Sequence, residues 1–341
     1  MPDTDAKVLP TAAPTAPSRW YRDATLWPLE RDRIFARAWL FASHVSDAPA
    51  PNCWRAEVLA GYPILLVRDG KGELRGFHNV CRHRAGPLTE GESGVCEGEL
   101  RCRYHGWRYA LDGRLKNARD FGAAANFDPR DFGLFPLRVK IWRGLVFVAL
   151  SDAAPAFEDW VAPLDKRLGD KDWSDHTVSL RRTHELGCNW KTYVENYLEG
   201  YHVADVHPGL NAEVEASQYK AEMDGLVAIH SVPMRDPNAV YDGLWAWLWP
   251  NLGFNVYSTG LMLERMAPLG AERTRLEYVY LNPPGTTLSE TTLAMSDAVT
   301  AEDKWIVERV QENLNAGVYS AGRLSPRPAR RPPSGCRRRP G

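Results

Sequence analysis

CRH at residues 81–83 and CRYH at residues 102–105 are the two segments of the sequence that decide the fold. Each segment begins with a cysteine and ends with a histidine, and both follow patterns typical of β-hairpin strands. Thiolate and imidazole groups are soft to borderline donors, which suit zinc or an iron–sulfur cluster. The sequence therefore predicts that a metal centre organises the first half of the chain.

Two kinds of metal centre fit these donors. Two cysteines and two histidines can hold a structural zinc ion. A Rieske-type [2Fe–2S] cluster takes two cysteines on one iron and two histidines on the other. The repeated order of cysteine before histidine favours the cluster, with Cys81, His83, Cys102 and His105 as its ligands.

The flanking residues resemble a known family. NVCRHRAGPL at residues 79–88 and CRYHGW at residues 102–107 are similar to the Rieske motifs of ring-hydroxylating oxygenases. The stretch between the two pairs is slightly longer than is usual for that family, and Cys96 in the extra loop is interpreted as a bystander. Respiratory Rieske proteins, which only carry electrons, have a second cysteine pair that forms a disulfide. This chain has Gly86 and Tyr104 at the matching positions.

A second polar group lies in the segment NWKTYVENYLEGYHVADVHP at residues 189–208. Glu195, Glu199 and His202 are spaced to share one face of a predicted helix. Pro208 ends that helix, so His202 and the next histidine can converge from its end and the following loop. Taken alone, two such histidines fit ordinary polar residues as well as metal ligands.

This segment resembles the catalytic iron motif of the same oxygenases. The resemblance implies that His202 and His207 ligate a mononuclear Fe(II) together with one carboxylate, a set that leaves positions open for O₂ and substrate. Asp303 is the predicted carboxylate, because EDKWIVE at residues 302–308 is similar to a late motif of that family. Glu302 is an alternative ligand, and a helix capping box from Thr300 to Asp303 needs no metal.

Two further carboxylates are predicted to act in catalysis, Glu199 and Glu195. The resemblance implies that Glu199 connects the two metal centres, by hydrogen bonds to His105 of one subunit and to His202 of its neighbour. Electron transfer would then cross a subunit interface, so a homotrimer is expected. The alternative is that Glu199 only orients His202.

The hydrophobic pattern and the resemblance together predict an α+β chain with two domains. Residues 1–17 are expected to be a disordered arm, and residues 18–44 a helical segment that packs on the catalytic domain. Residues 45–150 are the expected all-β Rieske [2Fe–2S] domain. Residues 156–322 are the expected catalytic domain, an antiparallel sheet with packed helices of the helix-grip type. Residues 323–341 are an atypical tail rich in proline and arginine.

Composition sets further limits. The 341 residues suit two domains, and 44% apolar with 25% charged residues is ordinary for a globular protein. A net charge of −1 gives no field that would attract nucleic acid or a membrane surface. Apolar runs are too short to span a bilayer and no signal pattern opens the chain, so we expect a cytoplasmic protein. The basic end at residues 328–341 fits a native arm or a frameshifted terminus, and we expect it to be disordered.

The resemblance implies a terminal oxygenase component that uses O₂. Its electrons would come from NAD(P)H through a separate reductase, with or without a ferredoxin. The expected reaction is hydroxylation or oxidative demethylation of a small organic substrate. Glu199, where many members of the family carry aspartate, favours the branch that oxidises choline, betaine and carnitine.

Two other functions remain open at this point. The first is cis-dihydroxylation of an aromatic ring. The second is a non-catalytic ligand-binding or electron-transfer Rieske protein. Trp245, Trp247 and Trp249 alternate along a predicted strand, so they share one face. They could pack in the core, or form an aromatic wall that stacks a ring or surrounds a quaternary ammonium group.

Overall fold

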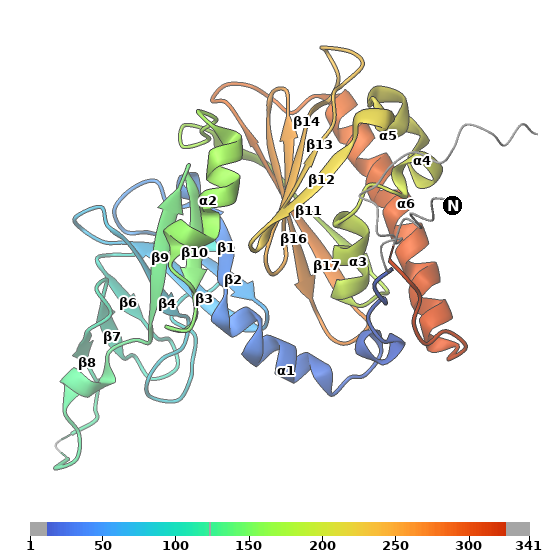
Figure 1. Ribbon diagram of the computed structural model, residues 1–341. Coiled ribbons are helices and arrows are strands. Elements are labelled where there is room, and N and C mark those ends of the chain that lie inside the picture. The colour runs from blue at the N-terminus through green and yellow to red at the C-terminus, as the bar shows by residue number, and fades with distance from the viewer. Residues whose placement is uncertain (1–11, 123, 325–341) are drawn as a thin grey trace, which may run out of the picture.

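The computed structural model describes residues 12–122 and 124–324. Figure 1 shows an N-terminal β-domain beside a larger C-terminal α+β domain, as the sequence predicted. Each domain has its own seven-stranded sheet, and the two sheets share no strand. The predicted disorder of residues 1–11 and 328–341 falls outside the described residues. In the described parts of the chain, no helix is both long and apolar enough to cross a membrane.

The β-domain is built on a seven-stranded antiparallel sheet and a small three-stranded sheet. The strand order of the large sheet is β1-β10-β9-β4-β3-β2-β5, and that of the small sheet is β6-β7-β8. The strands are β1 Trp39–His44, β2 Cys53–Leu59, β3 Tyr62–Arg68, β4 Leu74–His78, β5 Ser93–Val95, β6 Glu99–Arg101, β7 Arg108–Ala110, β8 Leu115–Asn117, β9 Pro136–Trp142 and β10 Leu145–Ala149. The interior strand β3 is buried on both faces along its middle residues, 64–67, which are all apolar.

The α+β domain contains a second seven-stranded antiparallel sheet, in the order β11-β17-β16-β15-β14-β13-β12. Its strands are β11 Thr177–Leu186, β12 Lys220–Asp224, β13 Val227–Ser231, β14 Tyr241–Leu248, β15 Leu252–Tyr257, β16 Gly260–Pro268 and β17 Thr274–Asn282. Its helices are α2 Phe157–Leu168, α3 Trp190–Tyr197, α4 Val203–Val206, α5 Pro208–Glu213 and α6 Glu290–Asn315. The long helix α6 packs against α3, α4 and α5, and α3 also contacts β16.

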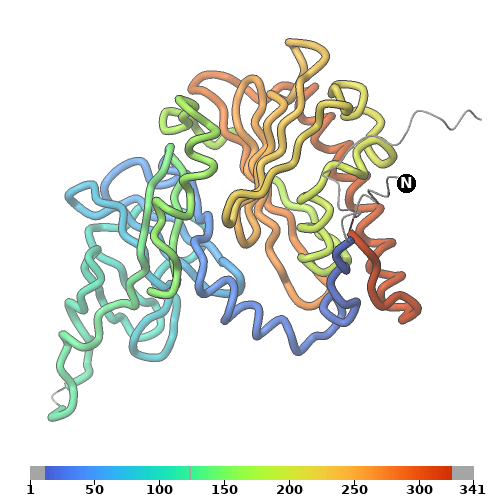
Figure 2. The backbone as a smooth tube through the Cα atoms, viewed as in Figure 1, coloured from blue at the N-terminus to red at the C-terminus, as the bar shows by residue number. Residues whose placement is uncertain are grey.

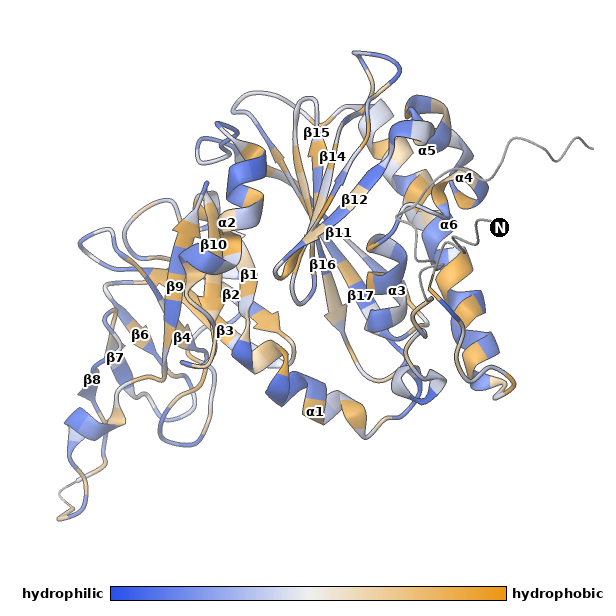
Figure 3. Ribbon diagram, viewed as in Figure 1, coloured by the Kyte–Doolittle hydropathy of each residue, from blue (hydrophilic) through white to orange (hydrophobic). Residues whose placement is uncertain are grey.

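Amphipathic patterning explains where α6 lies. Orange and blue bands alternate along this helix in Figure 3. Its buried positions include Asp303, Val307, Gln311 and Leu314, which recur at helical spacing. The buried side of α6 therefore carries two polar side chains, Asp303 and Gln311, among its apolar residues. This arrangement brings Asp303 toward α3 and α4.

The N-terminal segment corrects two expectations. Residues 18–37 contain only short helices, η1 Ser18–Tyr21, α1 Leu26–Arg33 and η2 Phe35–Arg37. Residues 39–44, predicted as helix, form β1, because six consecutive buried residues suit a strand that pairs with β10. Figure 2 shows the blue start of the described chain beside its red end, which follows α6. Backbone hydrogen bonds join Ser18 to Ser320 and Leu324 to Ala13, so residues 12–17 are part of this packing and not a free arm.

Two features hold the domains together. The apolar side of α2 joins one core cluster with residues of both large sheets, among them Phe147 and Val227. A buried guanidinium, that of Arg265 on β16, pairs with Glu57 on β2 at 2.9 Å and donates to the carbonyl oxygen of Phe41 at 3.0 Å. Removing either partner from a buried pair leaves an uncompensated charge, so these contacts fix the relative position of the domains.

Candidate functional site

The four predicted cluster ligands lie on two neighbouring loops of the β-domain. Cys81 and Cys102 are each only 2% exposed, and burial together with the adjacent Cys81 thiol raises the pKa of Cys102. The imidazole rings of His83 and His105 are 4.4 Å apart between centroids and are partly exposed. The sulfur atoms therefore lie on the inside of the site and the imidazoles lie toward solvent.

Two observations test whether these residues fit a cluster. The Nδ1 atom of His83 is buried and has no hydrogen-bond partner, as expected for a nitrogen that gives its lone pair to a metal. A Cβ atom added to Gly86 would lie 2.9 Å from Cys102 Sγ and 3.2 Å from Tyr104 Cβ. Gly86 and Tyr104 thus do face each other, and neither can form the disulfide of the electron-carrier class. The donor set fits a Rieske cluster.

Tyr109 belongs to this site, although the sequence did not single it out. Its hydroxyl lies 3.2 Å from Cys81 Sγ and accepts a hydrogen bond from the backbone N–H of Arg82 at 3.1 Å. Burial and the contact with Cys81 raise the pKa of Tyr109, so the phenol stays protonated and can donate to the sulfur. Trp107 stacks on His83 with ring centroids 4.9 Å apart. Nothing in the spacing of a lone tyrosine on a strand indicates such a role.

The second site begins where α3 ends. The side chain of Asn189 caps this helix by accepting a hydrogen bond from the N–H of Lys191 at 3.0 Å. The helix stops at Tyr197 and does not continue to Pro208 as predicted. Gly200 lies three residues beyond this end and packs closely against Tyr219, because a Cβ atom added there would lie 2.3 Å from the ring. The chain turns there and places His202 just before the short helix α4.

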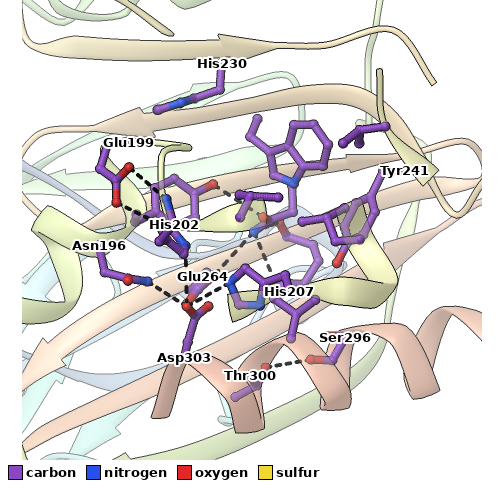
Figure 4. A pocket seen from close by; sticks show the side chains of 18 of the residues that line it. Asn196, Glu199, His202, His207, His230, Tyr241, Glu264, Ser296, Thr300 and Asp303 are labelled. Carbon is purple, nitrogen blue, oxygen red and sulfur yellow. Dashed lines mark hydrogen bonds and ion pairs between the residues drawn. The ribbon is translucent and has the colours of Figure 1, made fainter. Parts of the chain in front are cut away.

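Three donor atoms converge from this turn and from α6 (Figure 4). Asp303 Oδ1 lies 3.1 Å from His207 Nε2 and 3.7 Å from His202 Nε2. The ligand atoms of the three residues all lie within 4.8 Å of one another. His207 and Asp303 are 2% and 7% exposed. Two imidazoles and one carboxylate at this separation fit a divalent metal such as Fe(II).

Groups behind these residues point their donor atoms toward the common centre. His202 Nδ1 lies 2.6 Å from Glu199 Oε1, and His207 Nδ1 lies 2.8 Å from Glu302 Oε2. An imidazole whose Nδ1–H is bound to a carboxylate presents the Nε2 lone pair on its other side. Asn196, which the sequence analysis passed over, donates to Asp303 Oδ1 at 2.7 Å.

The same contacts decide between the alternatives for the third ligand. Glu302 lies behind His207 and not at the common centre. The capping-box alternative is wrong, because Thr300 lies inside α6, which begins at Glu290 and is capped by Ser289. Burial disfavours a charge on His207, but Asp303 and Glu302 outweigh burial and raise its pKa. The local field therefore favours a cation between these side chains.

Glu195 does not join this group. Its carboxylate is exposed and accepts a hydrogen bond at 2.5 Å from the hydroxyl of Tyr21 in the N-terminal segment. It does not line the cavity above the histidines. Because α3 ends at Tyr197, Glu195 and Glu199 are not on one helical face. This position contradicts the predicted catalytic role of Glu195 and makes it an anchor for the N-terminal segment.

A cavity opens above the three donor atoms. Its wall is rich in aromatic side chains and contains no lysine or arginine among the described residues. The aromatic lining residues are Tyr193, Tyr197, Tyr219, Tyr241, Trp245 and Tyr278. Of the three alternating tryptophans, Trp245 lines the cavity, whereas Trp247 is 3% exposed and packs edge-to-face with Trp249. Trp245 is therefore part of an aromatic wall, whereas Trp247 packs in the core.

Comparison with known proteins agrees with this arrangement. Residues 38–128 match the Rieske [2Fe-2S] domain family, and residues 173–329 match the family described as ring hydroxylating alpha subunit (catalytic domain). The chain is 31% identical to the choline monooxygenase, chloroplastic, of Beta vulgaris, over 94% of this chain and 75% of that one. It is also 31% identical to the carnitine monooxygenase oxygenase subunit of Escherichia coli K12, over 92% and 88% of the two chains.

Solved structures give the same result. The quaternary ammonium Rieske monooxygenase CntA in complex with L-carnitine superimposes with a TM-score of 0.81 at 28% identity, covering 92% of this chain and 89% of that one. Naphthalene 1,2-dioxygenase bound to phenanthrene gives a TM-score of 0.73 at 18% identity, which shows a shared fold alone. This chain therefore belongs to the Rieske non-haem iron oxygenases and is an enzyme of their ring-hydroxylating α-subunit type.

Proposed function

We propose that this oxygenase hydroxylates or oxidatively demethylates a small quaternary ammonium compound. The observation that carries the proposal is the cavity, because aromatic walls without a lysine or arginine suit an organic cation. The choline and carnitine monooxygenases, with which the chain aligns over most of its length, support the same substrate class. An external reductase would supply electrons from NAD(P)H, since no motif in the described residues resembles a nicotinamide or flavin site.

The geometry supports one set of ligands for each centre. Cys81, His83, Cys102 and His105 would hold the [2Fe–2S] cluster, and His202, His207 and Asp303 would hold the mononuclear iron. When bound, the iron supplies the chemistry of O₂ activation and the cluster supplies single electrons.

The protein's own groups prepare the iron site for that chemistry. Glu199 and Glu302 hold the Nδ1 protons of the two histidines, and Asn196 fixes one oxygen of Asp303. The burial of His207 limits the access of solvent to this side of the cavity. Each of these groups orients a ligand or excludes water.

A change at Glu302 tests the iron ligand set. Glu302→Gln removes the charge behind His207, and loss of such a partner typically lowers metal affinity by about 10- to 100-fold. We expect mononuclear iron to be lost at a lower chelator concentration while the visible spectrum of the cluster stays unchanged. Titration of the purified protein with a chelator, followed by iron analysis, measures this shift.

Glu312→Gln is the matched control, because Glu312 is exposed on the same helix and its one ion pair within the described part of the chain is with Arg309. This variant should retain iron like the parent protein. Equal iron retention in both variants would show that Glu302 does not support a metal ligand.

We also propose that the active form is a homotrimer in which electrons pass between subunits. The loops of the cluster site, next to β6 and β7, lie on the opposite side of the molecule from α4 (Figure 1). The side chain of Glu199 is 42% exposed in the single chain and His105 is partly exposed, so both are accessible to a neighbour. Inter-subunit electron transfer is described for a related quaternary ammonium Rieske monooxygenase. Glu199 of one subunit would hydrogen-bond both its own His202 and the neighbour's His105.

Mixed oligomers test this route. Subunits with Asp303→Ala lack one iron ligand, and subunits with His105→Ala lack one cluster ligand. Each variant alone should be inactive, whereas co-expressed oligomers that contain both should regain activity, because an intact cluster and an intact iron site meet across an interface. Purification with two different affinity tags selects the mixed species. Inactive mixed oligomers of the correct composition would contradict the route.

Turnover with a substrate panel tests the proposed activity itself. The purified protein, a Rieske oxygenase reductase and NADH are combined with choline, carnitine, glycine betaine or benzoate, and O₂ use is followed with product analysis. Demethylation would release formaldehyde. We expect product from a quaternary amine and none from benzoate. Dihydroxylation of benzoate without oxidation of any quaternary amine would instead support the ring-dihydroxylating alternative.

A further inference from the structure

A buried carboxylate in the cavity has no role in the iron site described above. Glu264 on β16 is 3% exposed and lines the cavity together with Asp303 and His207 (Figure 4). Among the described residues, no lysine, arginine or histidine forms an ion pair with it. The charge of another acid, Asp303, further disfavours a negative charge on Glu264 and so raises its pKa. Glu264 is therefore an acid buried without a positive partner.

The hydrogen bonds of Glu264 are unequal at its two oxygens. Oε1 accepts from the hydroxyl of Tyr193 at 2.6 Å and from that of Tyr278 at 3.2 Å. Oε2 has only the amide of Asn255 at 3.5 Å, which is at the limit of a hydrogen bond. One oxygen is thus fixed by two phenols, and the other keeps capacity for a further favourable contact.

An unpaired charge in this position is costly. Burial, with Asp303 adding to it, raises the pKa of Glu264 to about 7, although its hydrogen bonds act in the opposite direction. Replacement of Glu264 by glutamine would remove this cost while nearly keeping the shape of the side chain. A cation in the cavity would remove the cost in another way, by supplying the missing partner.

The surroundings of Glu264 match such a cation. The rings of Tyr197, Tyr241 and Trp245 line the same cavity. Aromatic faces attract a quaternary ammonium group by cation–π interaction. Such a group has no N–H to donate, so it is bound by negative electrostatic potential spread over several rings and not by one hydrogen-bond acceptor. A carboxylate behind such rings adds long-range attraction in a site of low dielectric constant.

We propose that Glu264 is the counter-charge that selects the cationic head of the substrate. This inference rests on the proposed function, and it assigns the recognition of charge to one residue. Glu264 acts as a specificity-determining residue: it discriminates a quaternary ammonium compound from a neutral molecule of the same shape. The iron ligands take no part in this discrimination.

Binding of a matched pair of ligands tests the proposal. Choline and 3,3-dimethylbutan-1-ol have the same shape, but the second carries carbon in place of the charged nitrogen. Calorimetry with the iron-replete protein gives Kd for each. The parent protein should prefer choline. In Glu264→Gln the Kd for choline should rise by about ten-fold or more, because a buried charge loses its partner, while that for the alcohol hardly changes.

Tyr278→Phe is the matched control. It removes one hydrogen bond to Glu264 and keeps the carboxylate, so this variant should still prefer choline. Loss of the preference in Tyr278→Phe to the same extent as in Glu264→Gln would assign Glu264 a structural role and overturn the proposal. The parent protein offers a test that depends on no variant: equal affinity for choline and the neutral alcohol would also overturn it.

Failure of this inference can be told apart from failure of the proposed function. If the parent enzyme oxidises a quaternary amine but Glu264→Gln still prefers the cation, only the role of Glu264 is wrong. If the parent enzyme binds and oxidises no quaternary amine in the panel, the proposed function and this inference fall together.

Discussion

The approach of Asp303 to the ε nitrogens of His202 and His207 is the contact on which the rest of the site depends. It requires a break after α3, which turns His202 and His207 inward, and a long helix α6 whose buried face carries an aspartate. Glu199 and Glu302 set the two rings from behind, so that both Nε2 atoms face the carboxylate. These partners come from different segments, and only the folded domain brings them together.

The negative charge of the cavity has two separate uses in this account. Asp303 faces the histidines, where a divalent metal would balance it. Glu264 lies on the sheet side, held by two phenols and with no metal ligand among its hydrogen-bond partners. A cavity that is lined by three carboxylates, those of Glu199, Glu264 and Asp303, and by aromatic side chains can therefore take up two kinds of cation, a metal beside the histidines and an organic cation beside Glu264. The buried Arg265–Glu57 contact keeps the domain that carries the cluster fixed on the domain that carries this cavity.

The sequence indicated those residues of the two sites that lie within short motifs. The Cys/His pairs lie in two short motifs, and Asp303 belongs to the motif at residues 302–308, so spacing and resemblance were enough to locate them. The end of α3 at Tyr197 was not predicted, because the glycine that weakens the helix lies three residues later and packs against Tyr219, which is distant in sequence. The predicted role of Glu195 failed for that reason. Glu264 and Tyr109 could not be found, since a lone acid or phenol on a strand gives no signal until the sheet places it beside its partners. The strand β1 was mistaken for a helix, because an apolar run next to short helices carries both periodicities.

The central claim is that one chain holds a two-iron cluster and a separate single iron. Metal analysis of the purified protein, combined with electron paramagnetic resonance after reduction, tests this claim most directly. The account predicts about three irons per chain and the signal of a reduced Rieske cluster, as the donor sets require. Zinc in place of iron in the β-domain, or a reduced protein without a two-iron signal, would contradict it.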